Sequence, residues 1–534
     1  MFTKPARLRP LRRPTTAAIA AALTAIALAQ TATPAAAADR FWTCPPNYFT
    51  NPVCWSNPGP LQASDNLLIR PNGPIPVEVN FPGAAGVNTT QMVRTLTLNG
   101  AANSAKPTLY VSSGSLSLTT LTVGVDYGAA VRQTGGSVGI VGTQINQFSS
   151  YSLSGGSLSA SANVSNMGVL DVSGTGRLLG RELVNSGSLS LTGANANIET
   201  ETTQNYGVIR LTDATWSSPS GVVYNAAGAA IYGSNSSTPA LVENKGNLVA
   251  NSGTLALANY GPALANSGGI AVLNFAELSV PRGLVNAARG VIALNGVDAG
   301  SGPQAYLSNA NTGATLINNG ALGGAGFVLM PVEHQGDLRT NVGKTLTFSQ
   351  SFSSAAGSTM ASDGVLSFAG PASFHNGALI SGAGASLFNG TLNLGDAGAA
   401  GRLRVDGDVS LRGMYFADIL GTVAGAGYDQ LAVGGKLTLA PGSVLRLGSG
   451  SFVAQAGQSF NLLDWDTLQG TFAQVDTSAL QLAAGTALDL SRLYIDGTLA
   501  VVAVPEPATW ALTIAGIVGL LARRRMGHQA WGQA

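Results

Sequence analysis

The chain has 534 residues and a formal net charge of +1; 10% of its residues are charged, 45% are hydrophobic and 69 are glycine. This composition argues against a disordered chain, because it can bury a core, and favours all-β structure with many turns over a helical bundle. The basic residues gather at both ends and leave an acidic body, so we expect no nucleic-acid partner, since phosphate binding needs clustered Lys and Arg.

Residues 1–38 have the pattern of a secretory signal peptide. Five basic residues precede an apolar stretch at 17–29, and Ala36, Ala37 and Ala38 offer an A-x-A cleavage site before Asp39. A permanent N-terminal membrane anchor is the alternative, but the apolar stretch is short and rich in alanine. The sequence therefore predicts export and removal of this segment.

Residues 39–89 are predicted to form a Trp- and Pro-rich N-terminal cap. Cys44 and Cys54 are the only cysteines, and an even pair ten residues apart in an exported protein predicts one local disulfide. No His lies near them, so we expect neither a metal site nor a cofactor. Trp55 to Pro58, followed by Asp65 and an apolar stretch, resembles the start of many bacterial β-solenoid surface proteins. That resemblance implies a cap over the first coil.

An asparagine recurs about every 20 residues through the middle of the chain. It is preceded two residues earlier by an apolar residue in nearly every copy, and followed by glycine and then by alternating apolar residues. Alternation predicts strands with one buried face, and the period predicts one coil of a parallel β-solenoid per repeat, with the asparagines stacked as a hydrogen-bonded ladder. The members of the predicted ladder are Asn146, Asn166, Asn185, Asn205, Asn225, Asn244, Asn266 and Asn286.

We therefore expect an all-β protein with a right-handed parallel β-helix over residues 90–420. The handedness comes from fold-level analogy. Glycine is expected to allow the tight corners, and asparagine to tolerate left-handed backbone angles there. An array of β-sandwiches is the alternative, although it does not require Asn at this spacing. Residues 421–503 change register and predict a C-terminal β segment that seals the last coil.

The C-terminal residues 504–534 have three parts in a fixed order. Val504, Pro505, Glu506 and Pro507 precede an uncharged apolar run at 508–522, which Arg523, Arg524 and Arg525 close. Proline is tolerated where a helix begins, so the run predicts a single C-terminal helix. As a helix, the run is about 22 Å long against a hydrocarbon core of roughly 30 Å, which is marginal for a permanent transmembrane helix. A buried C-terminal helix is the alternative, but no face of the run is polar.

This arrangement resembles the PEP-CTERM sorting signal of Gram-negative bacteria in all three parts. The resemblance implies recognition by an exosortase-type membrane protease, transient inner-membrane insertion, and delivery to the cell surface or the extracellular polysaccharide matrix. Residues 421–503 are also similar to the terminal segment of autotransporter passengers and of PEP-CTERM proteins.

Candidate catalytic residues are few. The chain has three histidines: His528 lies in the tail, and His334 stands where the repeat places its asparagine and is expected to be a turn residue. The charged residues Asp171, Arg210, Asp213, Glu243 and Lys245 are expected in different phases of the coil, whereas polysaccharide lyases and hydrolases need converging carboxylates. We therefore expect no catalytic site and a structural or adhesive role, the partner being extracellular polysaccharide. A carbohydrate-active enzyme on the same scaffold is the alternative.

Overall fold

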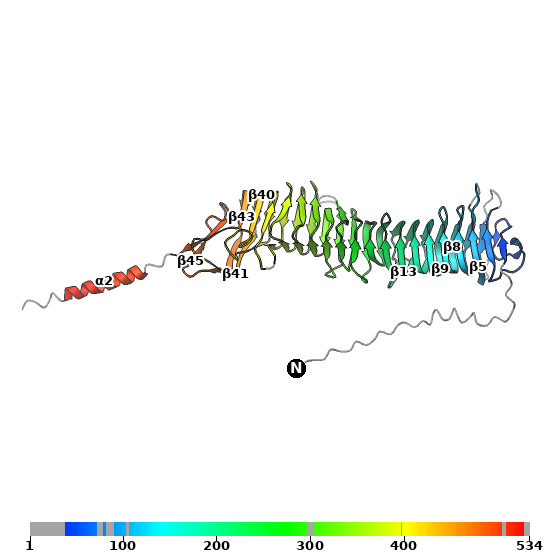
Figure 1. Cartoon of the computed structure of the whole chain (residues 1–534), viewed down its shortest axis with the longest axis horizontal. Helices are drawn as coiled ribbons and strands as arrows, with labels where there is room; N and C mark the ends of the chain where they lie inside the picture. The colour runs from blue at the N-terminus through cyan, green and yellow to red at the C-terminus, as the bar shows by residue number, and fades with distance from the viewer. Residues whose placement is uncertain are drawn as a thin grey trace, which may run out of the picture.

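The computed structural model describes residues 38–71, 78–81, 90–102, 106–296, 304–396, 398–504 and 509–527. Parallel β coils stack into an elongated rod, with the N-terminal coils at one end and helix α2 (Thr509–Gly527) beyond the other (Figure 1). The predicted all-β, parallel solenoid is confirmed. The single helix predicted at the C-terminus is also present.

The strands of the first part of the rod are β1 (Asp39–Phe41), β2 (Asn47–Tyr48), β3 (Asn66–Ile69), β4 (Glu78–Phe81), β5 (Thr90–Leu98), β6 (Thr108–Val111), β7 (Ser115–Val123), β8 (Ala130–Ile145), β9 (Ser150–Asn166), β10 (Val169–Val172), β11 (Arg177–Asn185), β12 (Ser188–Thr192), β13 (Asn197–Asn205), β14 (Val208–Thr212), β15 (Val222–Asn225) and β16 (Ala230–Thr238). A short 3-10 helix, η2, covers Pro52–Cys54.

The middle strands are β17 (Ala240–Asn244), β18 (Asn247–Leu257), β19 (Leu264–Asn266), β20 (Gly269–Val272), β21 (Ala276–Ser279), β22 (Leu284–Asn286), β23 (Val291–Asn295), β24 (Tyr306–Ser308), β25 (Leu316–Asn318), β26 (Ala321–Leu329), β27 (Val332–His334), β28 (Asp337–Thr340), β29 (Thr345–Phe348), β30 (Phe352–Ser354), β31 (Thr359–Ser362), β32 (Val365–Phe368) and β33 (Ala372–Phe374).

The last strands are β34 (Ala378–Ser381), β35 (Ala385–Phe388), β36 (Leu392–Leu394), β37 (Arg402–Val405), β38 (Asp408–Leu411), β39 (Met414–Asp418), β40 (Gln430–Leu439), β41 (Val444–Ala454), β42 (Ser459–Asn461), β43 (Leu463–Gly470), β44 (Gln474–Leu482), β45 (Thr486–Asp489) and β46 (Thr498–Ala503).

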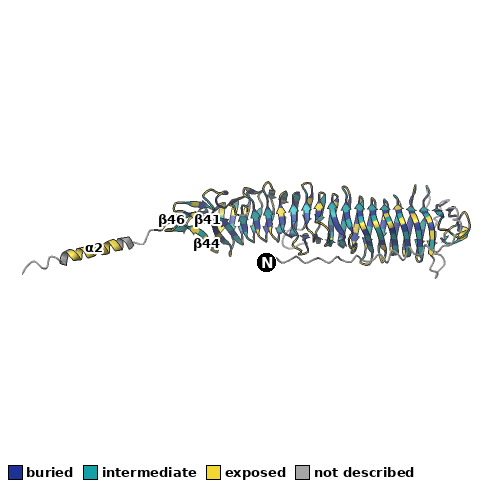
Figure 2. Cartoon of the chain, turned by 60° about the horizontal axis from the view of Figure 1, so that its bottom comes forward, coloured by how far each residue is buried: buried dark blue, intermediate teal, exposed yellow. Residues whose placement is uncertain are grey.

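Each coil contributes one strand segment to each of three faces, which we call A, B and C. In one coil, Arg177–Gly180 lies on face C, Glu182–Asn185 on face A and β12 on face B. Every segment pairs in parallel with its equivalents in the coils before and after it, as β12 does with β10 and β14. Alternate residues of a strand point to opposite faces, and buried residues alternate with less buried ones along the strands, while α2 is exposed (Figure 2).

The parallel stack is longer than the repeat in the sequence suggests. Pairing already begins at Asp39, whose register partner is Asn66, whereas the solenoid was expected to begin at residue 90. It also continues past residue 420, because β41 pairs with β44. Among the described residues, only β42, β45 and β46 form a separate, antiparallel sheet, next to the last coils. The first and last coils carry longer connections, which hide the period in the sequence.

The glycines that follow the asparagines are required by close contact between coils. A Cβ at Gly207 would lie 2.1 Å from the carbonyl oxygen of Gly187, and one at Gly187 would lie equally close to that of Gly168. These glycines and the asparagines before them do not have positive φ angles, unlike Gly174 or Gly193. The expected left-handed corner is therefore wrong, and the glycines serve to let the backbone of one coil lie directly on the next.

Candidate functional site

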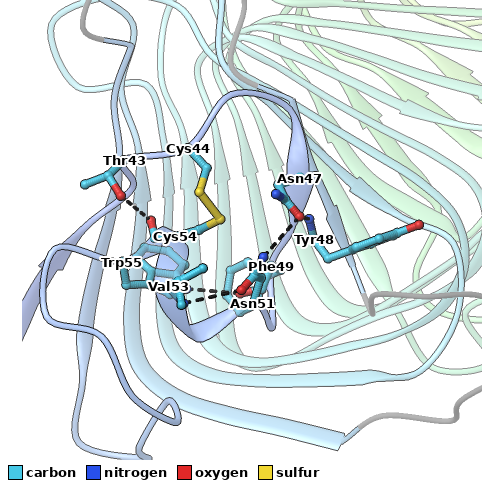
Figure 3. Close-up of a disulfide and its surroundings, with 9 residues drawn as sticks. All are labelled: Thr43, Cys44, Asn47, Tyr48, Phe49, Asn51, Val53, Cys54 and Trp55. Carbon is cyan, nitrogen blue, oxygen red and sulfur yellow. Dashed lines mark hydrogen bonds between the residues drawn. A yellow bond between two sulfur atoms is a disulfide. The ribbon is translucent and has the colours of Figure 1, made fainter.

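The N-terminal end of the rod is closed by a compact, disulfide-linked segment. Cys44 and Cys54 are bonded, with their Cα atoms 5.0 Å apart, beside η2 (Figure 3). Trp55 is buried, packs edge-on against Phe49 and donates its indole N–H to the Phe49 carbonyl. The aromatic rings and the disulfide fix this segment over the first coils, which reduces access to the unpaired strand edge there.

A buried ion pair ties the same segment to the first face A strands. Arg40 Nε lies 3.0 Å from Asp65 Oδ2, and both side chains are nearly inaccessible to solvent. Arg40 also donates to the carbonyls of Asn57 and Gly59, which satisfies further guanidinium hydrogens. Burial of a charged pair is tolerated where such additional hydrogen bonds are present.

The two predicted processing regions are only partly described. Ala38 is the first described residue and Ala36 lies outside the described residues; at the other end, Val504 is exposed whereas Pro505, Glu506 and Pro507 lie outside. The backbone of the three-arginine cluster, from Arg523 to Arg525, falls within α2.

Helix α2 exposes its apolar side chains to solvent. Leu512 is 72% and Leu520 is 70% accessible. Within the part of the chain that the structure describes, no helix combines the length and apolar character needed to cross a membrane. This corrects the expected transmembrane helix: α2 has 19 residues, but the arginines in its last turns shorten the uncharged stretch. The alternative of a buried C-terminal helix also does not hold.

A continuous asparagine ladder runs inside the rod along face A. Each side-chain amide donates through Nδ2 to Oδ1 of the asparagine one coil further along the chain, over distances of 2.7–2.8 Å. All members are buried, at 0–1% accessibility. The ladder consists of Asn166, Asn185, Asn205, Asn225, Asn244, Asn266, Asn286 and Asn318.

The second amide hydrogen of most ladder members caps a corner of the next coil. Asn166 donates to the Ser188 carbonyl at 2.9 Å, and Asn225 donates to the Asn247 carbonyl at 3.0 Å. A buried carbonyl without a partner is costly, so each asparagine satisfies both a side chain and a backbone group. The ladder therefore fixes the register of each coil relative to its neighbours.

Asn146, which the 20-residue spacing placed in this series, lies outside the ladder. Ile145 occupies the ladder position and pairs with Asn166, because β9 has one residue more between Ala160 and Val164 than β8 has between Ile140 and Thr143. A shift of one residue moves a side chain to the opposite face of a strand. Asn146 instead directs its amide to the Gly124 carbonyl.

His334 ends the ladder. It pairs in register with Asn318, is fully buried, and its Nδ1 lies 3.0 Å from Asn318 Nδ2 while its Nε2 lies 3.2 Å from the Thr359 carbonyl. The amide must donate to Nδ1, so Nε2 carries the hydrogen that Thr359 accepts. Burial lowers the pKa of His334, against the opposing effects of the Thr359 carbonyl and Asp337. His334 is thus a neutral interior residue at the end of β27, where a turn residue was expected.

A polar groove opens on the outside of face A beyond the ladder. Its cavity volume is about 420 Å³. Four register partners from consecutive coils form its floor, namely Ser353, Ser373, Asn393 and Phe416. We call it the face A groove. At about 4.8 Å per coil it extends roughly 14 Å along the rod.

One side of the face A groove is formed by titratable residues at the corner between faces A and B. His375, Asp396 and Asp418 line it. Ser354 Oγ accepts the His375 backbone N–H and lies 3.3 Å from Nδ1, which orients the ring. Burial lowers the pKa of His375, although Asp396 opposes this, and burial raises the pKa of Asp418.

A buried carboxylate supports this corner from inside. Asp429 accepts the backbone N–H groups of Gly401 at 2.7 Å and Asp418 at 2.9 Å, which joins two long corners. Burial raises the pKa of Asp429 to about 7, despite these two hydrogen bonds. Tyr415, also buried, has a pKa raised by burial and by the two carboxylates.

The groove was not foreseen from the sequence. The corners at 395–401 and 419–429 break the 20-residue period just where the groove forms, and these glycine-rich insertions were the available signal. Of the charged residues considered beforehand, Asp171 and Arg210 share one outward column of face B, separated by Ser190, which corrects their expected different phases. Glu243 lies on face A.

No metal centre is formed by His, Cys, Asp and Glu within the described ranges. The fold and the ladder define the protein as a parallel β-solenoid with a buried row of asparagines along part of one face. Neither protein-family models nor curated proteins give a significant match to the chain.

Proposed function

We propose that this chain is an exported structural or adhesive protein of the cell surface or extracellular polysaccharide matrix, processed at its C-terminal end by an exosortase-type membrane protease. The observation that carries the proposal is the three-part C-terminal sequence, from the motif at 504–507 to the arginines at 523–525. The exposed apolar side chains of α2 support it, because such a surface needs a covering partner. The rod supplies an extended, largely repetitive surface, which suits a matrix or adhesive role.

The experiment is mass spectrometry of the mature termini in cell-surface fractions, from hosts with and without the exosortase. We expect an N-terminus near Asp39 and loss of 523–525 in the exosortase-positive host, and an intact C-terminal end in the other. The double variant Pro505→Ala with Pro507→Ala should keep its tail, whereas the control Pro441→Ala, at an exposed turn, should lose it. Surface-exposed protein that retains Arg525 would contradict the proposal.

A carbohydrate-active enzyme is the second candidate, favoured by the presence of His375, Asp396 and Asp418 in one groove. Glycoside hydrolysis needs two carboxylates, one of them protonated at working pH. Release of reducing sugar ends or of unsaturated products from matrix polysaccharide by the full chain, lost in Asp418→Asn, would establish this alternative. We expect no such release.

A further inference from the structure

We propose that the face A groove binds an extended glycan that carries free amino groups, of the poly-glucosamine type. The inference deepens the proposed function and rests on it, because a matrix location brings the rod into contact with such polymers. Its basis is the arrangement of Ser353, Ser373, Asn393 and Phe416 together with the two lining carboxylates.

The floor of the groove matches a linear ligand lying along the rod axis. Ser353, Ser373 and Asn393 are direct register partners, so two hydroxyls and an amide follow one another at about 4.8 Å. This interval is close to the length of one sugar residue in an extended chain. Hydroxyl and amide groups can both donate and accept, as sugar hydroxyls require.

The end of the floor offers an apolar surface. Phe416 follows Asn393 in the same column, and its ring extends over Gly448, where a Cβ would lie 3.0 Å from Phe416 Cζ. The glycine thus leaves space for the ring. An aromatic ring beside polar groups suits the C–H face of a pyranose, which is apolar while its edges are polar.

The charge of the lining selects the ligand. Asp396 and Asp418 both line the groove, and no Lys or Arg does. Among the described residues neither carboxylate takes part in an ion pair. His375 adds no fixed positive charge, because burial lowers its pKa. An ammonium group would compensate the two carboxylates, whereas a uronic acid would be repelled.

The long corners explain why a groove exists at this place and not along the ladder. In the ladder coils β11 ends at Asn185 and β12 begins at Ser188, so the corner is too short to form a wall. Here β36 ends at Leu394 and β37 begins at Arg402, and β39 ends at Asp418 and β40 begins at Gln430, so both corners are long. Asp429 joins them through the backbone N–H groups of Gly401 and Asp418. Binding residues on loops held by a rigid scaffold are a common arrangement.

The test is isothermal titration calorimetry of the full chain with hexamers of glucosamine, N-acetylglucosamine and galacturonic acid. We expect binding of the glucosamine hexamer, weakened by salt, binding at least about tenfold weaker for the N-acetyl form, and none for the uronate. Phe416→Ala and Asp418→Asn should each weaken glucosamine binding about tenfold or more. Tyr224→Ala, in the same outward column at a ladder coil, should leave it within about twofold.

Absence of glucosamine binding, equal binding of the uronate, or unchanged binding in both Phe416→Ala and Asp418→Asn would overturn the inference. Circular dichroism of each variant separates loss of binding from loss of fold. The binding result does not depend on the result for C-terminal processing. If the tail is cleaved on cells but the chain does not bind the glucosamine hexamer, the groove assignment alone is wrong. If the chain binds the hexamer but keeps its C-terminal tail at the cell surface, the sorting assignment alone is wrong.

Discussion

The ladder coils and the coils that follow them share one backbone plan but fill it with different chemistry. From Asn166 to Asn318 the interior of face A holds a row of hydrogen-bonded amides. From Phe348 to Phe388 the interior holds phenyl rings, with Phe348, Phe368 and Phe388 stacked in register on face C at 5.2–5.5 Å between centroids. His334 stands between the two regions and contacts both, through Asn318 and through the ring of Phe352.

The difference shows two ways of holding coils in register. The amide row is directional and admits only one alignment, because a slip by one residue would bury unpaired donors and acceptors. The aromatic row contributes more stability, because its rings bury more apolar surface. It fixes the register less strictly, because a ring tolerates small displacements. Both regions share the backbone hydrogen bonds of the parallel strands, so they differ in their interior side chains. The amides fix the register of the coils, whereas the aromatic rings add stability through burial.

Removal of a stacked ring should give the largest effect. Phe368 contacts Phe348, Phe352, Phe374 and Phe388, so Phe368→Ala should destabilise its coils by about 3–5 kcal/mol. Phe368→Leu serves as the control and should cost less, since most of the apolar volume remains. The measurement is chemical denaturation combined with hydrogen exchange. A loss below about 1 kcal/mol would show that the rings do not carry the packing assumed here.

Interruption of the amide row should cost less, and the cost should depend on position. Asn225→Ala removes the side-chain acceptor of the Asn205 amide and the side-chain donor to Asn244 Oδ1, and we expect a loss of about 1–3 kcal/mol. Asn166→Ala should cost less, because Asn185 Oδ1 is the one side-chain partner that it leaves unpaired, and because Asn166 Oδ1 already lacks a partner among the described residues. Equal losses for the two variants in local hydrogen exchange would argue against a continuous ladder.

The corner behind the groove should weaken as pH rises. The pKa of Asp429 is raised to about 7 in the fold from an ordinary value of 3.8, so between these values the unfolded chain has lost a proton that the fold retains. Local stability should fall by up to about 1.4 kcal/mol per pH unit between pH 4 and 7. Hydrogen exchange of β40 reports it. Asp429→Asn should abolish the slope, and the control Asp476→Asn, at a partly exposed carboxylate away from this corner, should keep it.

The end of the ladder should respond to pH in the opposite direction. The folded pKa of His334 is below its ordinary 6.5, so the unfolded chain binds a proton first as pH falls. Stability is therefore complete above about pH 6.5 and declines below it until the folded pKa is reached. Hydrogen exchange of the backbone amides in the coils of Asn318 and Thr359, at pH 7.5 and at pH 5.5, measures this change in local stability. His334→Asn should remove the dependence; a pH-independent wild type would show that the folded pKa of His334 is not lowered.

The sequence predicted the regular part of the molecule because a stacked coil repeats its constraints. Each ladder Asn and following Gly meets the same neighbours one coil away, so Asn185, Asn205 and Asn225 recur at equal spacing. Asn146 was misplaced because a bulge changes the count by one. Asn318 was not assigned to the ladder because 32 residues separate it from Asn286.

The face A groove could not be predicted from the sequence, because it depends on contacts between residues that do not follow the 20-residue spacing. Phe416 and Asn393 become neighbours only after the corner at 395–401 is placed. Asp418 and His375 line one groove although corners of unequal length separate them in sequence. Corner lengths are set by local turns, which do not reveal where a side chain will point. The disulfide of Cys44 and Cys54 is local in sequence, and its pairing needed no knowledge of the fold.

The one-way donation along the ladder aligns the side-chain dipoles with the rod axis. The carbonyl end of this row is Asn166 Oδ1 and the N–H end faces His334, so the row acts as the peptide dipoles of a helix do, negative at one end and positive at the other. The positive end disfavours an imidazolium at residue 334, whereas a histidine introduced by Ile145→His, beside the negative end, would be favoured in its protonated form. Identical residues at the two ends of one row would thus titrate differently.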